Sequence, residues 1–63
     1  MTYINERAME LAAEIRSADI WDMDALAELC KLAGMEAAWA AADDSSFEQV
    51  AFAAAERLGV ELL

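Results

Sequence analysis

The chain of 63 residues is long enough for one domain only, because a chain this short buries about 60% of the surface that its unfolded form exposes. It has 4 Lys and Arg against 13 Asp and Glu, which gives a net charge of −9, and 60% of its residues are hydrophobic. These values exclude a disordered acidic tail, and the shortage of basic residues argues against direct binding to nucleic acid. With 16 alanines in the chain, we expect short helices around a small core.

The residue types that most enzymes and metal sites use are scarce. There is no His and a single Cys, Cys30, which argues against Cys/His metal sites, an internal disulfide and His-based catalysis. We therefore expect a non-enzymatic protein with no catalytic residue, no bound metal and no cofactor. A basic segment followed by an apolar one, as in a secretion signal, is missing, and no uncharged run is long enough to cross a bilayer. The expected location is cytoplasmic, with no membrane contact.

The spacing of apolar residues predicts the first helix over residues 3–17. The apolar positions recur at the interval of one helical face, and they are Ile4, Ala8, Leu11, Ala12 and Ile15. The opposite face carries acidic residues four positions apart.

A second helix is predicted over residues 22–33, with Asp22 or Asp24 as its N-cap. Gly34 supplies the left-handed residue that ends it. Its apolar face consists of Leu26, Leu29, Cys30, Leu32 and Ala33. Because Cys30 lies on this face and no His is available to activate it, we expect a buried thiol with a structural role.

Two further helices are predicted in the second half of the chain. A short one covers residues 35–41, with Trp39 as its large side chain, and another covers 46–58 after a capping box of Ser45 and Glu48. The apolar face of the last helix consists of Phe47, Val50, Ala51, Ala54 and Leu58, and Gly59 ends it. Residues 60–63 are apolar enough either to fold back on the bundle or to pair with another chain. The expected fold is all-α, a compact bundle of three to four short helices that forms one acidic domain over residues 1–63.

Residues 25–39 resemble a DNA-binding helix-turn-helix, since Cys30 is a small residue four positions before the turn glycine Gly34 and a second helix follows. The second helix, however, offers Glu36, alanines and Trp39, and it has no Arg, Lys, Asn or Gln to contact base edges. The resemblance therefore implies only the geometry of a helical hairpin.

Acidic residues are the first candidates for a binding surface. On a helix, Glu6, Glu10 and Glu14 form a ladder of carboxylates about 6 Å apart, a spacing similar to that of phosphates along a nucleic-acid strand. A solvated helix face is the alternative interpretation. Further acidic candidates lie near the ends of helices: Asp22, Asp24, Asp43 and Asp44. The two Asp pairs lack the glycine turn and distal Glu of an EF-hand loop, so capping is their expected structural role.

Apolar residues that lie off the predicted helix faces are the second candidates. Phe52 shares its side of the last helix with Glu48 and Glu56, and Met9 lies off the apolar face of the first helix. Together with Trp39 they either complete the core of a small bundle or serve as apolar anchors for a partner protein.

In length, charge and helical pattern the chain resembles the short acidic proteins of phages and mobile elements that inhibit host nucleases, the anti-CRISPR and antirestriction proteins, some of which mimic DNA. The resemblance implies a phage protein that acts in the host cytoplasm and blocks a basic nucleic-acid-binding effector, such as a CRISPR nuclease or complex. The expected partner surface combines the acidic candidates with Trp39 and Phe52. The alternative is a self-associating helical adaptor, for instance a homodimer, whose acidic surface keeps it soluble.

Overall fold

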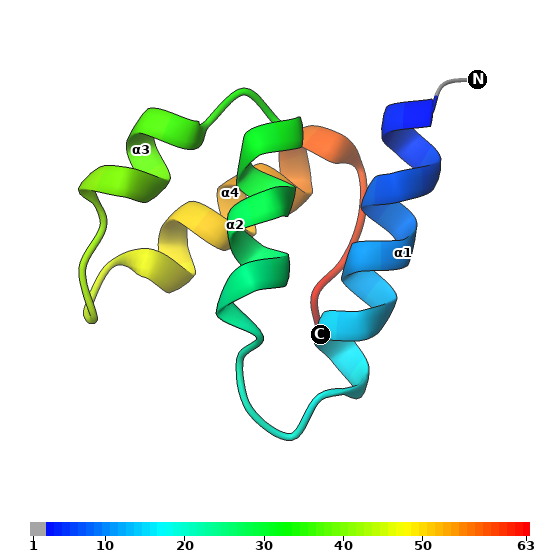
Figure 1. Ribbon diagram of the computed structural model, residues 1–63, viewed down its shortest axis with the longest axis horizontal. Coiled ribbons are helices and arrows are strands. Elements are labelled where there is room, and N and C mark those ends of the chain that lie inside the picture. The colour runs from blue at the N-terminus through cyan, green and yellow to red at the C-terminus, as the bar shows by residue number, and fades with distance from the viewer. Residues whose placement is uncertain (1–2) are drawn as a thin grey trace.

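A computed structural model describes residues 3–63, with side chains from Glu6 onward (Figure 1). It contains four α-helices: α1 (Tyr3–Ser17), α2 (Met23–Leu32), α3 (Glu36–Ala41) and α4 (Phe47–Leu58). The described residues form no strand, and every helix boundary lies within one residue of its predicted position. The predicted all-α bundle is therefore confirmed.

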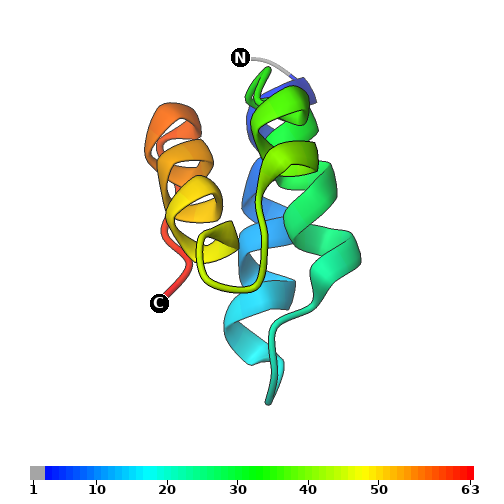
Figure 2. The same cartoon turned by 90° about the vertical axis from the view of Figure 1, so that its left-hand side faces the viewer.

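The helices pack in two layers. α1 and α2 run antiparallel beside each other, and α3 leads from the end of α2 to the start of α4 (Figure 1). The view turned by 90° shows that α4 and the residues after it lie on one side of the α1–α2 pair (Figure 2). α4 contacts both helices of that pair, and the main core contains buried residues from all three of these helices.

The core is built mainly from leucine and alanine. Leu11, Leu26, Leu29 and Leu62 are the largest apolar side chains that are almost completely buried. Buried alanines surround them and come from three helices: Ala8, Ala12, Ala25, Ala51 and Ala55. The small alanine side chains let the helix backbones approach closely, which is how so short a chain encloses a core. The predicted face of α1 is confirmed from Ala8 to Ile15, whereas the side chain of Ile4 lies outside the described residues.

The predicted apolar face of α4 is only partly correct, because its alanines are buried but its large side chains are not. Ala51, Ala54 and Ala55 are buried, whereas Phe47, Val50 and Leu58 are only half-buried at the edges of the core. α2 shows a smaller difference of the same kind, because Ala25 is buried and Leu32 is half-buried. In both helices, alanines take buried positions while some of the larger apolar side chains lie at the edge of the core.

Both predicted glycine stops are confirmed. Gly34 and Gly59 have φ angles of 75° and 76°, the left-handed region that glycine adopts without strain. After α2, the N–H of Met35 donates to the carbonyl of Cys30 at 2.8 Å, and after α4 the N–H of Val60 donates to the carbonyl of Ala55 at 2.9 Å. Each helix therefore ends in the hydrogen-bond pattern of a Schellman motif.

The N-termini of α2 and α4 are capped differently. Asp22 is the N-cap of α2, and its Oδ1 accepts a hydrogen bond from the N–H of Ala25 at 3.2 Å. The predicted capping box of Ser45 and Glu48 is wrong, because the N-cap residue of α4 is Ser46, which makes no side-chain cap bond. The serines instead bond Asp43. Its Oδ1 accepts hydrogen bonds from the Ser45 N–H, the Ser45 hydroxyl and the Ser46 hydroxyl, each at 3.0 Å.

The residues after α4, which we call the tail (60–63), fold back on the bundle. Leu62 is buried, Val60 is half-buried, and Arg16 of α1 donates a hydrogen bond to the carbonyl of Glu61. The first of the two predicted placements of this segment is therefore the one observed. Among the described residues, no helix has both the length and the hydrophobicity that a membrane span requires.

Cys30 is completely buried on α2, as predicted. It packs with Ala33 and Ala54 in a small second cluster that Val50 and Met35 border. Burial raises the pKa of the Cys30 thiol, because the thiolate would lose its hydration there. The residue therefore acts as a small apolar side chain at the contact between α2 and α4.

Candidate functional site

The acidic ladder lies on the outward side of α1. Glu6, Glu10 and Glu14 are all exposed, whereas Ala8 and Leu11 face the core. The middle carboxylate is paired, because Nη1 of Arg7 donates to Oε1 of Glu10 at 3.1 Å. Within residues 6–63, Glu6 and Glu14 form no ion pair. Two of the three ladder charges are thus available to an external cation.

The three arginines all make bonds within the chain. Arg7 donates from Nε and Nη2 to the two carboxylate oxygens of Glu28, at 2.8 and 2.9 Å. Arg57 donates to the carbonyl of Ala33 at 3.1 Å, and Arg16 donates to the carbonyl in the tail. These bonds join α1 to α2, α4 to the end of α2, and α1 to the tail. Because Arg16 and Arg57 bind backbone carbonyls, neither forms an ion pair with a carboxylate among the described residues.

The other acidic candidates do not join the ladder. Asp22 caps α2, and Asp43 organises the turn before α4, where the hydrogen bonds from Ser45 and Ser46 lower the pKa of its carboxyl. Asp24 and Asp44 are exposed. Figure 1 places α1 and the α3–α4 turn toward opposite ends of the longest axis, along which the molecule extends 33 Å. The predicted acidic set is therefore divided among α1, the start of α2 and the α3–α4 turn.

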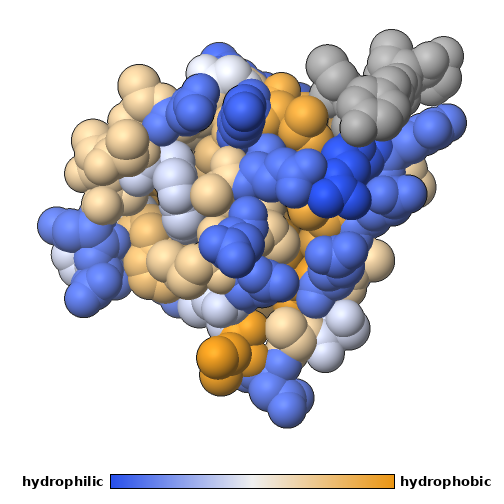
Figure 3. All heavy atoms as spheres, viewed as in Figure 1, coloured by the Kyte–Doolittle hydropathy of each residue, from blue (hydrophilic) through white to orange (hydrophobic). Residues whose placement is uncertain are grey.

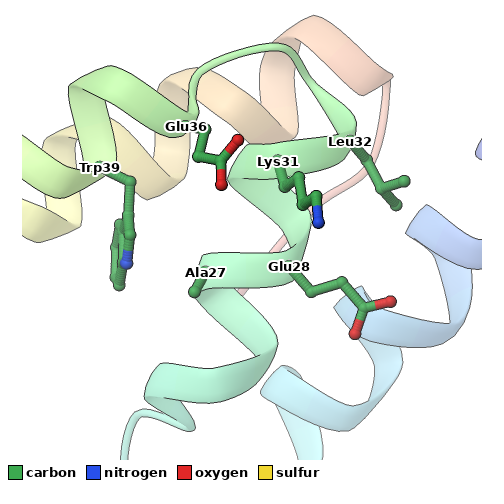
Figure 4. Close-up of a pocket in the computed structure, with 6 residues that line it drawn as sticks. All are labelled: Ala27, Glu28, Lys31, Leu32, Glu36 and Trp39. Atoms are coloured by element: carbon green, nitrogen blue, oxygen red, sulfur yellow. The ribbon is translucent and has the colours of Figure 1, made fainter.

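Trp39 belongs more to the core than to the surface. It is half-buried, packs against the core, and meets the ring of Phe47 edge-on at a centroid distance of 6.2 Å. Its exposed part lines an open hollow of about 680 Å³ between α2 and α3, together with Lys31 and Glu36 (Figure 4). The hollow is a mixed surface, because Glu28, Lys31 and Glu36 line it beside Leu32 and Trp39. On the face seen in Figure 3, hydrophilic side chains likewise interrupt the apolar areas.

Phe52 and Met9 are exposed, as the prediction of apolar anchors requires. Their exposed fractions are 38% and 63%. Phe52 also contacts the ring of Trp21 edge-on, at a centroid distance of 6.0 Å, and Nε1 of Trp21 donates to Glu48 at 2.8 Å. Trp21 therefore attaches the α1–α2 loop to α4.

Sequence reasoning missed Trp21 and Ile20, and it considered Leu63 only as part of the apolar segment 60–63. Ile20 and Leu63 are the most exposed large apolar side chains, at 81% and 85%. Ile20 and Trp21 lie between two helices and Leu63 lies in the tail, so helical periodicity says nothing about them. Their size and hydrophobicity in a polar connection were the available signal.

The described residues offer few groups that could bind a metal ion or form a buried polar site. They contain no group of three or more Cys, Asp or Glu side chains placed to hold a metal ion, and none of their polar or charged side chains is buried. What the arrangement offers is an acidic helix face and exposed apolar side chains, which are features of binding surfaces.

Comparison with known proteins does not identify a family. No family model, no curated protein and no solved structure matches this chain.

Proposed function

We propose that this protein is a non-enzymatic inhibitor that binds a basic nucleic-acid-binding effector, such as a CRISPR nuclease or complex, through the acidic face of α1. The observation that supports this proposal most is the exposure of Glu6, Glu10 and Glu14 along one helix while all three arginines bond within the chain. The face would occupy the groove in which phosphates normally lie. In keeping with this role, the protein would act in the cytoplasm, that of the host if it is encoded by a phage.

Electrostatics support the same role. Like charges one helical turn apart repel each other, which costs a few tenths of a kcal/mol per pair in the free protein. A cationic groove removes that repulsion on binding. The net charge of −9 on 63 residues also attracts a basic partner over a distance, so association should be fast and should weaken as salt rises.

The test is inhibition of DNA cleavage by a guide-loaded CRISPR nuclease, with a ladder variant that combines Glu6→Lys and Glu14→Lys. This variant keeps Glu10, so the bond between Arg7 and Glu10 stays intact. We expect inhibition to weaken by about tenfold or more, and target DNA to compete with the wild-type protein for the nuclease.

A distal variant with Glu36→Lys and Asp44→Lys is the matched control. Both residues are exposed, and the control changes the net charge by the same amount away from α1. We expect it to keep most of the inhibition. Equal inhibition by the wild type and the ladder variant at physiological salt would contradict the proposal.

The exposed apolar residues favour a second candidate, a self-associating helical adaptor. Phe52 of α4 and Leu63 of the tail are exposed and line the same hollow. In this case Phe52→Ala or Trp39→Ala should weaken association more than the ladder variant does, and salt should have little effect. Sedimentation velocity over a range of protein concentrations measures this directly.

A further inference from the structure

Three shallow hollows meet around the tail. One of about 370 Å³ lies between α4 and the tail and is lined by Phe52, Val60 and Leu63 among others. A second of about 460 Å³ lies between α1 and the tail, where Met9 and Val60 line it. A third of about 230 Å³ includes Ile20 and Leu63. Val60 borders the first two hollows and Leu63 borders the first and third, so the three hollows are neighbours linked by shared lining residues.

We call this the tail surface and define it by its large apolar residues, Met9, Ile20, Phe52, Val60 and Leu63. Four of the five are among the exposed large apolar side chains of the molecule. A contiguous apolar area on a small protein typically marks an interaction site. The buried Leu62 and the bond from Arg16 to the carbonyl of Glu61 hold the tail in place. A partner would therefore meet a surface that is already formed.

The rim of the tail surface is acidic. Glu56 and Glu61 line the hollow beside Phe52, and Asp19 lines the hollow beside Ile20. Glu6, the first residue of the acidic ladder, borders it on α1, because Met9 follows Glu6 by three positions and such residues are neighbours on a helix. Among the residues that line the three hollows, Arg16 is the one cation; it lines the hollow between α1 and the tail, and it already donates to the tail.

This charge pattern determines which occupant fits. A second copy would bring the same acidic rim, and a second charge of −9, against the first. Like charges placed opposite each other disfavour association, whereas a partner with Lys and Arg around its apolar residues gains from every rim carboxylate.

We propose that the tail surface docks a basic amphipathic segment of the partner protein. Large apolar side chains of that segment enter the hollows on either side of Val60, and flanking Lys or Arg side chains pair with Glu56, Glu61 and the ladder. The inference rests on the proposed function for one point, the basic character of the partner. It adds that apolar contacts, as well as charge, determine affinity.

The probe is a synthetic amphipathic helix made of leucine and lysine, titrated into the protein and followed by calorimetry and amide NMR shifts. Met9→Gln and Leu63→Gln remove apolar contacts at side chains that are 63% and 85% exposed, so both variants should fold as the wild type does. Each should weaken peptide binding by about fivefold or more. Met23→Gln is the matched control, because Met23 is exposed but lies in a hollow next to Trp39, away from the tail.

We expect the amide shifts to concentrate at residues 60–63 and the control to bind as the wild type does. A peptide of alanine and lysine, with the same charge, should bind more weakly and should not distinguish Met9→Gln from the wild type. Equal affinity of the leucine and lysine peptide for wild type, Met9→Gln and Leu63→Gln would overturn the inference. Concentration-dependent dimers that Leu63→Gln abolishes would also overturn it, because the occupant would then be a second copy.

The two proposals fail separately. If the ladder variant loses inhibition of the nuclease while Met9→Gln and Leu63→Gln bind the peptide normally, only the tail-surface inference is wrong. If the ladder variant inhibits fully while the two Gln variants lose the peptide, the proposed function is wrong and the docking surface stands.

Discussion

Arg7 of α1 holds Glu28 of α2 with two parallel hydrogen bonds, from Nε to Oε2 at 2.8 Å and from Nη2 to Oε1 at 2.9 Å. The planar guanidinium matches both carboxylate oxygens, so the pair fixes the rotation of α1 against α2 as well as their distance. The hydrogen bonds raise the pKa of Arg7 and lower the pKa of Glu28. The same arginine also bonds Glu10, so this contact influences how the ladder is presented.

Glu28→Gln should lower the melting temperature, because the amide offers one acceptor oxygen and no charge to Arg7. Both side chains are partly exposed, so the difference from the wild type should shrink as salt rises. Glu36→Gln is the control, since it removes the same charge from an exposed residue outside the ion pairs of the described chain. Circular dichroism melts at low and high salt measure both. Identical melting of the two variants would show that the Arg7–Glu28 pair does not stabilise the fold.

Leu29→Ala should destabilise the protein by about 2–5 kcal/mol, because it leaves a cavity in a core that has no other side chain to fill it. Leu29 has an exposed fraction of 0%, and the whole stability of a domain this small is about 3–5 kcal/mol. The variant should therefore be largely unfolded at room temperature. Leu63→Ala, at an exposed position, should change the stability by less than about 0.5 kcal/mol. Urea unfolding of both tests the assignment of the core.

Gly34→Ala should cost about 1–2 kcal/mol, the penalty for an L-residue in the left-handed region. The φ angle of Gly34 is 75°, and no atom beyond its chain neighbours lies within 4 Å of the position that a Cβ would take, so the cost is conformational and not a clash. Gly34→Asn should be milder, since asparagine tolerates this region better. If both variants unfold at the same urea concentration as the wild type, α2 does not need its glycine stop.

Asp43→Asn should lower the melting temperature at neutral pH but not at low pH. The hydrogen bonds from Ser45 and Ser46 lower the pKa of Asp43 in the folded protein, so ionised Asp43 stabilises the fold above its unfolded pKa of about 4. That contribution is lost as the pH falls through the lower, folded value. The wild type should therefore melt above the Asn variant at neutral pH, and the gap should close below about pH 4. A gap that stays constant down to pH 2 or so would contradict this account.

Cys30 should react with a thiol reagent only after the protein opens. Its side chain is fully buried and burial raises its pKa, so little thiolate is available in the folded state. The reaction rate in the native protein should be far below that in urea, and Leu29→Ala should raise it. Fast labelling of the wild type without denaturant would show that the α2–α4 contact opens readily.

The sequence by itself determined the helices and most of their ends. The period of Ala8, Leu11, Ala12 and Ile15 specifies α1, and Gly34 and Gly59 specify two helix ends, because hydrophobic spacing and backbone sterics act within a few residues. The exposure of the ladder follows from the same period. These features depend on no distant residue, and for that reason they can be read from the chain alone.

The tertiary structure decided which separate segments meet. Arg7 bonds Glu28 of α2 as well as Glu10, its neighbour on α1. Asp43 accepts hydrogen bonds from the serines, and Glu48 accepts one from Trp21. The tail packed against α1 and α4, which brought Met9, Phe52 and Leu63 to neighbouring hollows beside it. Each of these groups could bond more than one partner, and which bond forms depends on distances that are set only when the core is packed. Local spacing does not carry that information.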